Sequence, residues 1–182
     1  METLFAKQDR LLLLTSTEII RTLMHRINWD AQLVAIRGPR GVGKTTLMLQ
    51  YMKLHYEVYS REVLYCTLDS VYFSNHTLLE LADVFVKNGG KHLFLDEVHK
   101  YPTWSKEIKE VYDMYPDLKV VFSASSLLNI LNADADLSRR CIPYEMQGLS
   151  FREFLLFYKQ MSFPVCTLEE VLTSPEKIPS EV

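Results

Sequence analysis

The sequence predicts an α/β fold, a mostly parallel five-stranded sheet that is doubly wound, with helices on both faces. Short apolar runs alternate about five times with longer amphipathic segments, which is typical of buried parallel strands linked by helices. Several of these runs end at a polar residue, as at Asp69, Asp96 and Ser123. Ligands of open α/β sheets collect at the carboxyl ends of strands, so these positions are candidate site residues. The strands are expected at residues 31–37, 62–68, 92–95, 118–122 and 141–146.

The helices follow from 3.6-residue periodicity and from their start signals. They are expected at 44–56, 78–87, 103–114, 127–131 and 150–161, with a further helix at 15–26 outside the core. Asn75 is the expected N-cap of the second helix. Ser150, followed by Glu153 three residues later, predicts a capping box for the last one. Residues 166–182 read as a linker or an unfinished element.

Length and composition place the chain among ordinary globular proteins. It has 182 residues, a net charge of -3 and 48% hydrophobic residues, enough for one core and a small appendage. We expect an N-terminal helical segment at 1–30, the core at 31–148, and the start of a truncated helical lid at 149–182. The longest stretch without Asp, Glu, Lys or Arg, residues 120–133, is too short and polar to cross a bilayer. With no signal peptide and three scattered cysteines, we expect a cytoplasmic protein with no membrane partner.

A glycine-rich loop between the first strand and the next helix predicts phosphate binding. Its residues fit G-x-x-x-x-G-K-[ST], in which glycines let backbone N–H groups point at phosphate oxygens. Lys44 would contact the β- and γ-phosphates, and the Thr45 hydroxyl would bind Mg²⁺. Thr46 is a weaker candidate for an α-phosphate contact, and Arg40 faces either the nucleotide or solvent. The loop consists of Gly38, Pro39, Arg40, Gly41, Val42, Gly43, Lys44 and Thr45.

An acidic pair follows the third strand. Asp96 is the expected Mg²⁺ residue, and Glu97 the general base that polarises the attacking water. Taken alone, such a pair could also complement the dipole of a following helix. Asp69, after the second strand, either reaches the magnesium shell or caps a turn. His99 is either structural or an active-site contact.

The fourth strand and the residues before the fifth add further candidates. Ser123 and Ser125 stand where a hydroxyl could sense the γ-phosphate, although Ser125 equally suits a helix N-cap. An arginine just before the fifth strand, Arg140 or its neighbour Arg139, could reach a neighbouring subunit's site and stabilise transition-state charge. The alternative is a surface pair of charges.

Four stretches together resemble a known family. GPRGVGKTTL at 38–47, LFLDEVHKYPTW at 93–104, FSASSLL at 122–128 and GLSFREFL at 148–155, with the arginines at 139–140, look like the AAA-family P-loop ATPase domain of a group of prokaryotic proteins. The resemblance covers roughly residues 10–160. In that family the domain is usually followed by a lid, a winged-helix-like region and a restriction-nuclease-like C-terminal domain.

The resemblance implies a P-loop NTPase with sheet order 5-1-4-3-2 and ATP as the nucleotide. It assigns Lys44 and Thr45 to the phosphate loop, and Asp96 and Glu97 to magnesium and the base. It further matches Ser123 and Ser125 to a sensing turn, and Arg140 to a position near a trans-acting finger. Ala124, Arg139 and Gly148 depart from the family pattern, and Arg139 leaves the choice of finger open between the two arginines.

These observations lead to one expected function and two alternatives. We expect Mg-dependent ATP hydrolysis by an AAA-type core that drives conformational change in a larger protein, of which this chain is an N-terminal fragment. Partners would be ATP, further copies of the chain, and a nucleic acid or protein bound through the C-terminal domains. One alternative is a nucleotide-gated regulatory or scaffold module with little turnover. The other is a DNA-associated ATPase, which rests on family analogy alone.

Overall fold

The computed structural model describes residues 1–124, 137, 139–162 and 166–173. It divides into two compact units, Met1–Gly148 and Leu149–Val182. Each unit is considered by itself. Within the described residues, no helix is long and apolar enough to cross a membrane.

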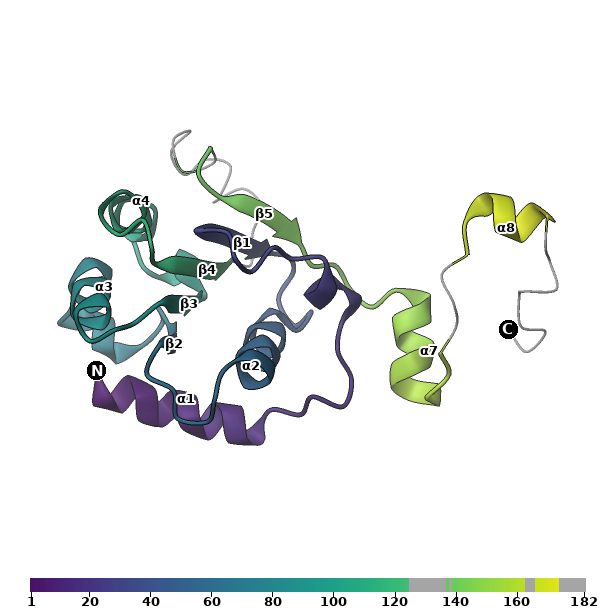
Figure 1. Cartoon of the computed structure of the whole chain (residues 1–182), viewed down its shortest axis with the longest axis horizontal. Helices are drawn as coiled ribbons and strands as arrows, with labels where there is room; N and C mark the ends of the chain where they lie inside the picture. The colour runs from purple at the N-terminus through teal and green to yellow at the C-terminus, as the bar shows by residue number, and fades with distance from the viewer. Residues whose placement is uncertain (125–136, 138, 163–165, 174–182) are drawn as a thin grey trace. The chain divides into compact units, whose positions relative to one another are not determined.

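The first unit contains the expected five-stranded sheet, in which every strand pair is parallel (Figure 1). The order β2-β3-β4-β1-β5 confirms the doubly wound P-loop NTPase fold and the order 5-1-4-3-2. Each strand lies within two residues of its predicted bounds. The strands are β1 (Leu33–Arg37), β2 (Val63–Thr67), β3 (His92–Asp96), β4 (Lys119–Ala124) and β5 (Ile142–Glu145).

Helices cover both faces of this sheet. Figure 1 shows α2 (Lys44–His55) on one face, and α3 (Leu78–Lys87) and α4 (Trp104–Met114) on the other. The α2 side buries Leu47, Met48 and Met52 against alternate strand residues such as Phe94, because successive side chains of a strand point to opposite faces. The opposite face packs against apolar residues of α3 and α4. Short 3-10 helices lie at Thr22–His25, Val71–Ser74 and Val98–Lys100.

The expected helix at 15–26 is wrong. The N-terminal helix is instead α1 (Glu2–Leu14), which contacts β2 and α2. Residues 15–26 contain only a 3-10 turn, because several of their backbone carbonyls accept from side chains of α2 rather than from their own N–H groups. Gln50 donates to the carbonyls of Ser16 and Ile19 at 2.8 and 2.9 Å, and Lys53 donates to that of Thr15 at 2.7 Å.

The expected cap of α3 is also wrong. Asn75 follows the 3-10 turn, and the N-cap is Thr77. The Thr77 hydroxyl accepts from the Glu80 N–H at 3.1 Å, and the Glu80 carboxylate accepts from the Thr77 N–H at 2.9 Å. This reciprocal pair satisfies two N–H groups that the first turn leaves unbonded, which Asn75 cannot do two residues earlier.

Two helices lie among the described residues of the second unit. In α7 (Phe151–Lys159) the predicted capping box between Ser150 and Glu153 is confirmed. Residues Leu168–Thr173 form α8, a helix within the segment that was expected to be a linker or an unfinished element. The Thr167 hydroxyl accepts from the Glu170 N–H at 3.2 Å and starts that helix. The helix expected at 127–131 lies outside the described residues.

Candidate functional site

The loop between β1 and α2, which the sequence predicts to bind phosphate, has a backbone that requires glycine at two positions. Gly43, the N-cap of α2, has a φ of 99°, a left-handed conformation that L side chains rarely adopt. At Gly38 a Cβ would lie 2.0 Å from the backbone oxygen of Met146, so only glycine fits there. The loop therefore passes closely over the residue that follows β5, and it leads directly into the positive end of α2.

Lys44 is buried at the first position of α2. Its Nζ donates to the carbonyl oxygens of Gly38 at 2.8 Å and Pro39 at 2.9 Å. Burial lowers the pKa of Lys44, while the negative charges of Glu97 and Asp96 act in the opposite direction. The ammonium group of Lys44 thus bonds the carbonyls of its own loop. These carbonyls carry only partial negative charge, whereas a bound phosphate would provide full negative charge.

Asp96 joins the loop to the sheet. Its Oδ2 accepts from the Thr45 hydroxyl at 2.6 Å, and its Oδ1 accepts from the Ser123 hydroxyl. The contact with Ser123 follows from the strand order, because β4 lies between β1 and β3 and pairs Leu95 with Phe122, one residue before this pair. Thr45 and Ser123, which were predicted from two different motifs, are therefore both hydrogen-bonded to Asp96.

Glu97 follows Asp96 in an unusual backbone conformation. Its φ is 53°, which is uncommon for a residue other than glycine and costs about 1 kcal/mol or more. Two acceptors hold its N–H, Asp96 Oδ1 and Ser123 Oγ, each at 3.1 Å. The carboxylate, 29% exposed, lies 3.2 Å from Nε2 of His99. His99 therefore contacts Glu97, a candidate site residue.

Sequence reasoning missed Tyr65. Its hydroxyl donates to Asp96 Oδ2 at 2.8 Å from the neighbouring strand β2. The available signal was a polar-tipped side chain in an otherwise apolar strand. The strand order had to be combined with side-chain alternation to place that hydroxyl beside Asp96.

A family model described as an AAA domain matches residues 30–155 of this chain. The chain belongs to this family. It is therefore a nucleotide-binding module of the ATPase type. The match spans both the phosphate loop and the acidic pair, which are the two motifs that the fold brings together.

Relatives of this AAA domain include two proteins of Methanocaldococcus jannaschii. Uncharacterized protein MJ1637 is 26% identical over 155 residues, covering 81% of this chain and 32% of its own length. Uncharacterized protein MJ1544 is 28% identical over 131 residues, covering 69% of this chain and 29% of its own length. The chain thus spans about a third of the length of these curated relatives. Among solved structures, that of C. elegans PCH-2 is similar with a TM-score of 0.48 and 13% identity, covering 80% of this chain and 42% of that one.

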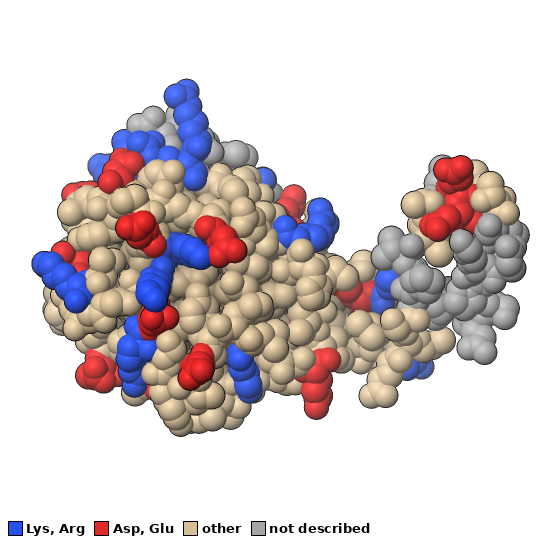
Figure 2. All heavy atoms as spheres, viewed as in Figure 1, with Lys and Arg blue, Asp and Glu red and all other residues tan. Residues whose placement is uncertain are grey.

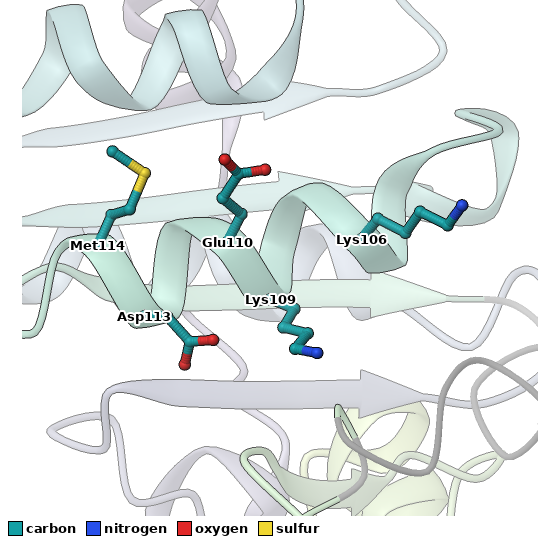
Figure 3. A pocket seen from close by; sticks show the side chains of 5 residues that line it. All are labelled: Lys106, Lys109, Glu110, Asp113 and Met114. Atoms are coloured by element: carbon teal, nitrogen blue, oxygen red, sulfur yellow. The ribbon is translucent and has the colours of Figure 1, made fainter.

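The arginine predicted as a finger has a partner within this AAA domain. Arg140 Nε lies 3.1 Å from Oδ1 of Asp113 on α4, and its guanidinium lies 5.9 Å from the centre of the Tyr112 ring. Figure 3 shows Asp113 and Lys109 on one side of α4, where they line a shallow surface hollow with other residues of that helix. The structure thus places Arg140 beside α4, and a role in a neighbouring subunit remains a proposal.

The remaining candidates of the AAA domain are exposed or lie outside the described residues. Arg40 and Thr46 are exposed, and Asp69 is exposed after β2 with its N–H directed at the Thr67 hydroxyl at 3.4 Å. Ser125 lies outside the described residues. Over the face shown in Figure 2, acidic and basic side chains of the first unit are interspersed, in keeping with a net charge of -3.

Proposed function

We propose that this AAA domain binds ATP with Mg²⁺ at the phosphate loop and hydrolyses it. The observation that carries the proposal is the direct bonding of Thr45, at the start of α2, and Ser123, at the end of β4, to the single carboxylate of Asp96. A hydroxyl from the loop and a carboxylate from the strand beyond it are the pair that P-loop ATPases need around a phosphate-bound metal.

The residues present fit both ligands. The loop offers backbone N–H groups and a buried ammonium, and a phosphate beside Lys44 would offset the burial that lowers the pKa of this group. Thr45 and Asp96 offer hard oxygen donors, which Mg²⁺ prefers. When bound, Mg²⁺ would neutralise charge on the β- and γ-phosphates.

Glu97 is the residue that we assign to the chemical step. Its partly exposed carboxylate would accept a proton from a water molecule as the water oxygen bonds to the γ-phosphorus. The bond from that phosphorus to the bridging oxygen of ADP then breaks, and ADP leaves with the electron pair. The Ser123 and Asp96 acceptors support this role by fixing the Glu97 backbone.

Nucleotide binding by Lys44→Ala tests the assignment of the loop. Losing charge-assisted contacts worth about 1.5–3 kcal/mol is expected to weaken ATP binding by about 10- to 100-fold. Lys53→Ala is the matched control, because Lys53 lies on the same helix and its ammonium bonds the Thr15 carbonyl instead. Wild-type affinity in Lys44→Ala would overturn the assignment.

A nucleotide-gated scaffold with little turnover is the second candidate, favoured by the pairing of Arg140 with Asp113 in its own chain. If Arg140 is the finger, turnover per chain should rise with protein concentration as copies associate. Concentration-independent, negligible turnover together with ATP-dependent association would instead support the scaffold.

A further inference from the structure

Tyr65 lies on β2, next to the strand that ends at Asp96, the proposed Mg²⁺ residue. In the register of β2 and β3, Tyr65 is opposite Phe94 and Thr67 is opposite Asp96. Residues two apart share a face, so the Tyr65 ring lies on the α2 side of the sheet together with Asp96. The ring is buried, and its hydroxyl donates to Asp96 Oδ2 at 2.8 Å.

The Tyr65 hydroxyl is a donor to Asp96. An ordinary tyrosine keeps its phenol proton at physiological pH, and here that proton is directed at Asp96 Oδ2. Asp96 Oδ2 then has two donors of different character. Thr45 belongs to the phosphate loop and rotates about one side-chain bond, whereas Tyr65 is fixed in a strand.

Among the described residues, four groups donate to Asp96, two to each of its carboxylate oxygens. Oδ1 accepts from Ser123 and the Glu97 N–H, and Oδ2 accepts from Thr45 and Tyr65. A hydroxyl that turns to a metal can no longer serve the carboxylate in the same way. If Thr45 turns to Mg²⁺, Tyr65 is the donor that keeps Oδ2 in place.

The helix α1 fixes the backbone of Tyr65 in turn. Strand β2 is an edge of the sheet, and Gln8 of α1 is buried against it. Gln8 Oε1 accepts from the Tyr65 N–H at 2.7 Å, and Gln8 Nε2 donates to the Val63 carbonyl at 3.3 Å. One side-chain amide thus satisfies the N–H and C=O that a further strand would otherwise pair.

We propose that Tyr65 is a positioning residue that holds the Asp96 carboxylate for Mg²⁺, and that Gln8 of α1 fixes Tyr65 for this task. The inference rests on the proposed binding of Mg-ATP. It adds a contribution of the N-terminal helix and of the edge strand to a site that the motifs alone confine to the loop, β3 and β4.

Tyr65→Phe tests the proposal, because it removes the hydroxyl and keeps the ring. The readout is ATP affinity, measured by calorimetry with excess Mg²⁺ and again with EDTA; the ratio gives the enhancement by Mg²⁺. Groups that orient metal ligands typically contribute 10- to 100-fold to metal affinity, so the enhancement is expected to fall about tenfold. Affinity in EDTA should stay at the wild-type value, since the hydrogen bond that Tyr65→Phe removes goes to Asp96 rather than to the loop.

Tyr56→Phe is the matched control. Tyr56 is half-buried, and its hydroxyl bonds Nδ1 of His92 at 2.7 Å. Removing it costs a tyrosine hydroxyl's hydrogen bond without touching Asp96, so the enhancement should stay at the wild-type value. A purely structural role for Tyr65 would lower the unfolding temperature in both variants and leave both enhancements equal.

The outcomes separate the two proposals. A wild-type chain that binds ATP no better with Mg²⁺ overturns the proposed function and this inference with it. A wild-type enhancement that persists in Tyr65→Phe overturns the positioning role alone. Gln8→Ala keeps the hydroxyl and provides the second variant should Tyr65→Phe not fold. Its enhancement is expected to fall in the same direction, and an unchanged value overturns the part assigned to α1.

Discussion

Ser123 is the residue whose removal tests the site most quantitatively. Its side chain is fully buried, donates to Asp96 Oδ1 and accepts from the Glu97 N–H at 3.1 Å. In Ser123→Ala the Glu97 N–H keeps Asp96 Oδ1 as an acceptor at 3.1 Å, so no donor is left unbonded. Ser123→Ala therefore removes two hydrogen bonds, and the one to the charged Asp96 sets the main cost, about 1.5–3 kcal/mol.

That magnitude can be measured by urea denaturation followed by circular dichroism. We expect the free energy of unfolding of Ser123→Ala to fall by about 2 kcal/mol, which for a chain of this size lowers the unfolding temperature by about 4–8 °C. ATP hydrolysis should fall more than ATP binding, because the left-handed backbone of Glu97 loses one of its two supports.

Ser60→Ala is the control for this measurement. The Ser60 hydroxyl accepts from the Glu62 N–H at 3.3 Å in a turn away from the site, so its loss should change the free energy of unfolding by about 0.5 kcal/mol or less. Equal destabilisation by the two substitutions would refute the reasoning, since it would mean that the bond to Asp96 contributes no more than a turn contact.

Three further predictions concern the loop, the core and the arginine. Gly38→Ala places a Cβ 2.0 Å from the backbone oxygen of Met146, and no side-chain rotation relieves that clash. Urea denaturation should show that the free energy of unfolding falls by about 2–4 kcal/mol, and a wild-type value would contradict this prediction. Burial lowers the pKa of His92 to about 3 from 6.5, so the unfolded chain takes up the proton first. The stability that neutral His92 allows is therefore complete above pH 6.5 and is lost at about 1.4 kcal/mol per pH unit as the pH falls towards 3. Urea titrations at several pH values should show that the free energy of unfolding of His92→Phe falls less steeply with pH than that of the wild type. An equal dependence on pH in the two proteins would count against burial of His92 as the cause. Finally, Asp113→Ala removes a partly exposed partner of Arg140, worth about 0.2–1 kcal/mol, so turnover at high protein concentration should rise by up to about fivefold; a steady-state assay that finds no rise would exclude Asp113 as a restraint on a trans-acting Arg140.

The parts of the fold that follow local rules could be predicted from the sequence. Lys44 and Thr45 stand in a motif whose chemistry fixes both the turn and the helix start, and Asp96 ends an apolar run whose strand character is unambiguous. The order of the strands required the family resemblance, because periodicity does not say which strands are neighbours.

The rest depends on contacts between distant segments. Tyr65 becomes a site residue only because β2 lies beside β3, and Gln8 because α1 closes the free edge of β2. The prediction of a helix at 15–26 was wrong for the same reason. Gln50 of α2 donates hydrogen bonds to backbone carbonyls that would otherwise bond within that helix. The wrong N-cap of α3 has a local cause instead. Thr77 followed by Glu80 three residues later is a capping-box signal that the sequence contains, but the prediction chose Asn75.

Single-turnover hydrolysis by Glu97→Gln tests the central claim most directly. With enzyme in excess over ATP and Mg²⁺ present, the wild-type chain should release phosphate. Glu97→Gln should bind ATP with wild-type affinity and release phosphate at least about 100-fold more slowly, as expected for the loss of a general base. Equal rates of phosphate release from the two proteins would contradict the assignment of Glu97 and, with it, the catalytic reading of this site.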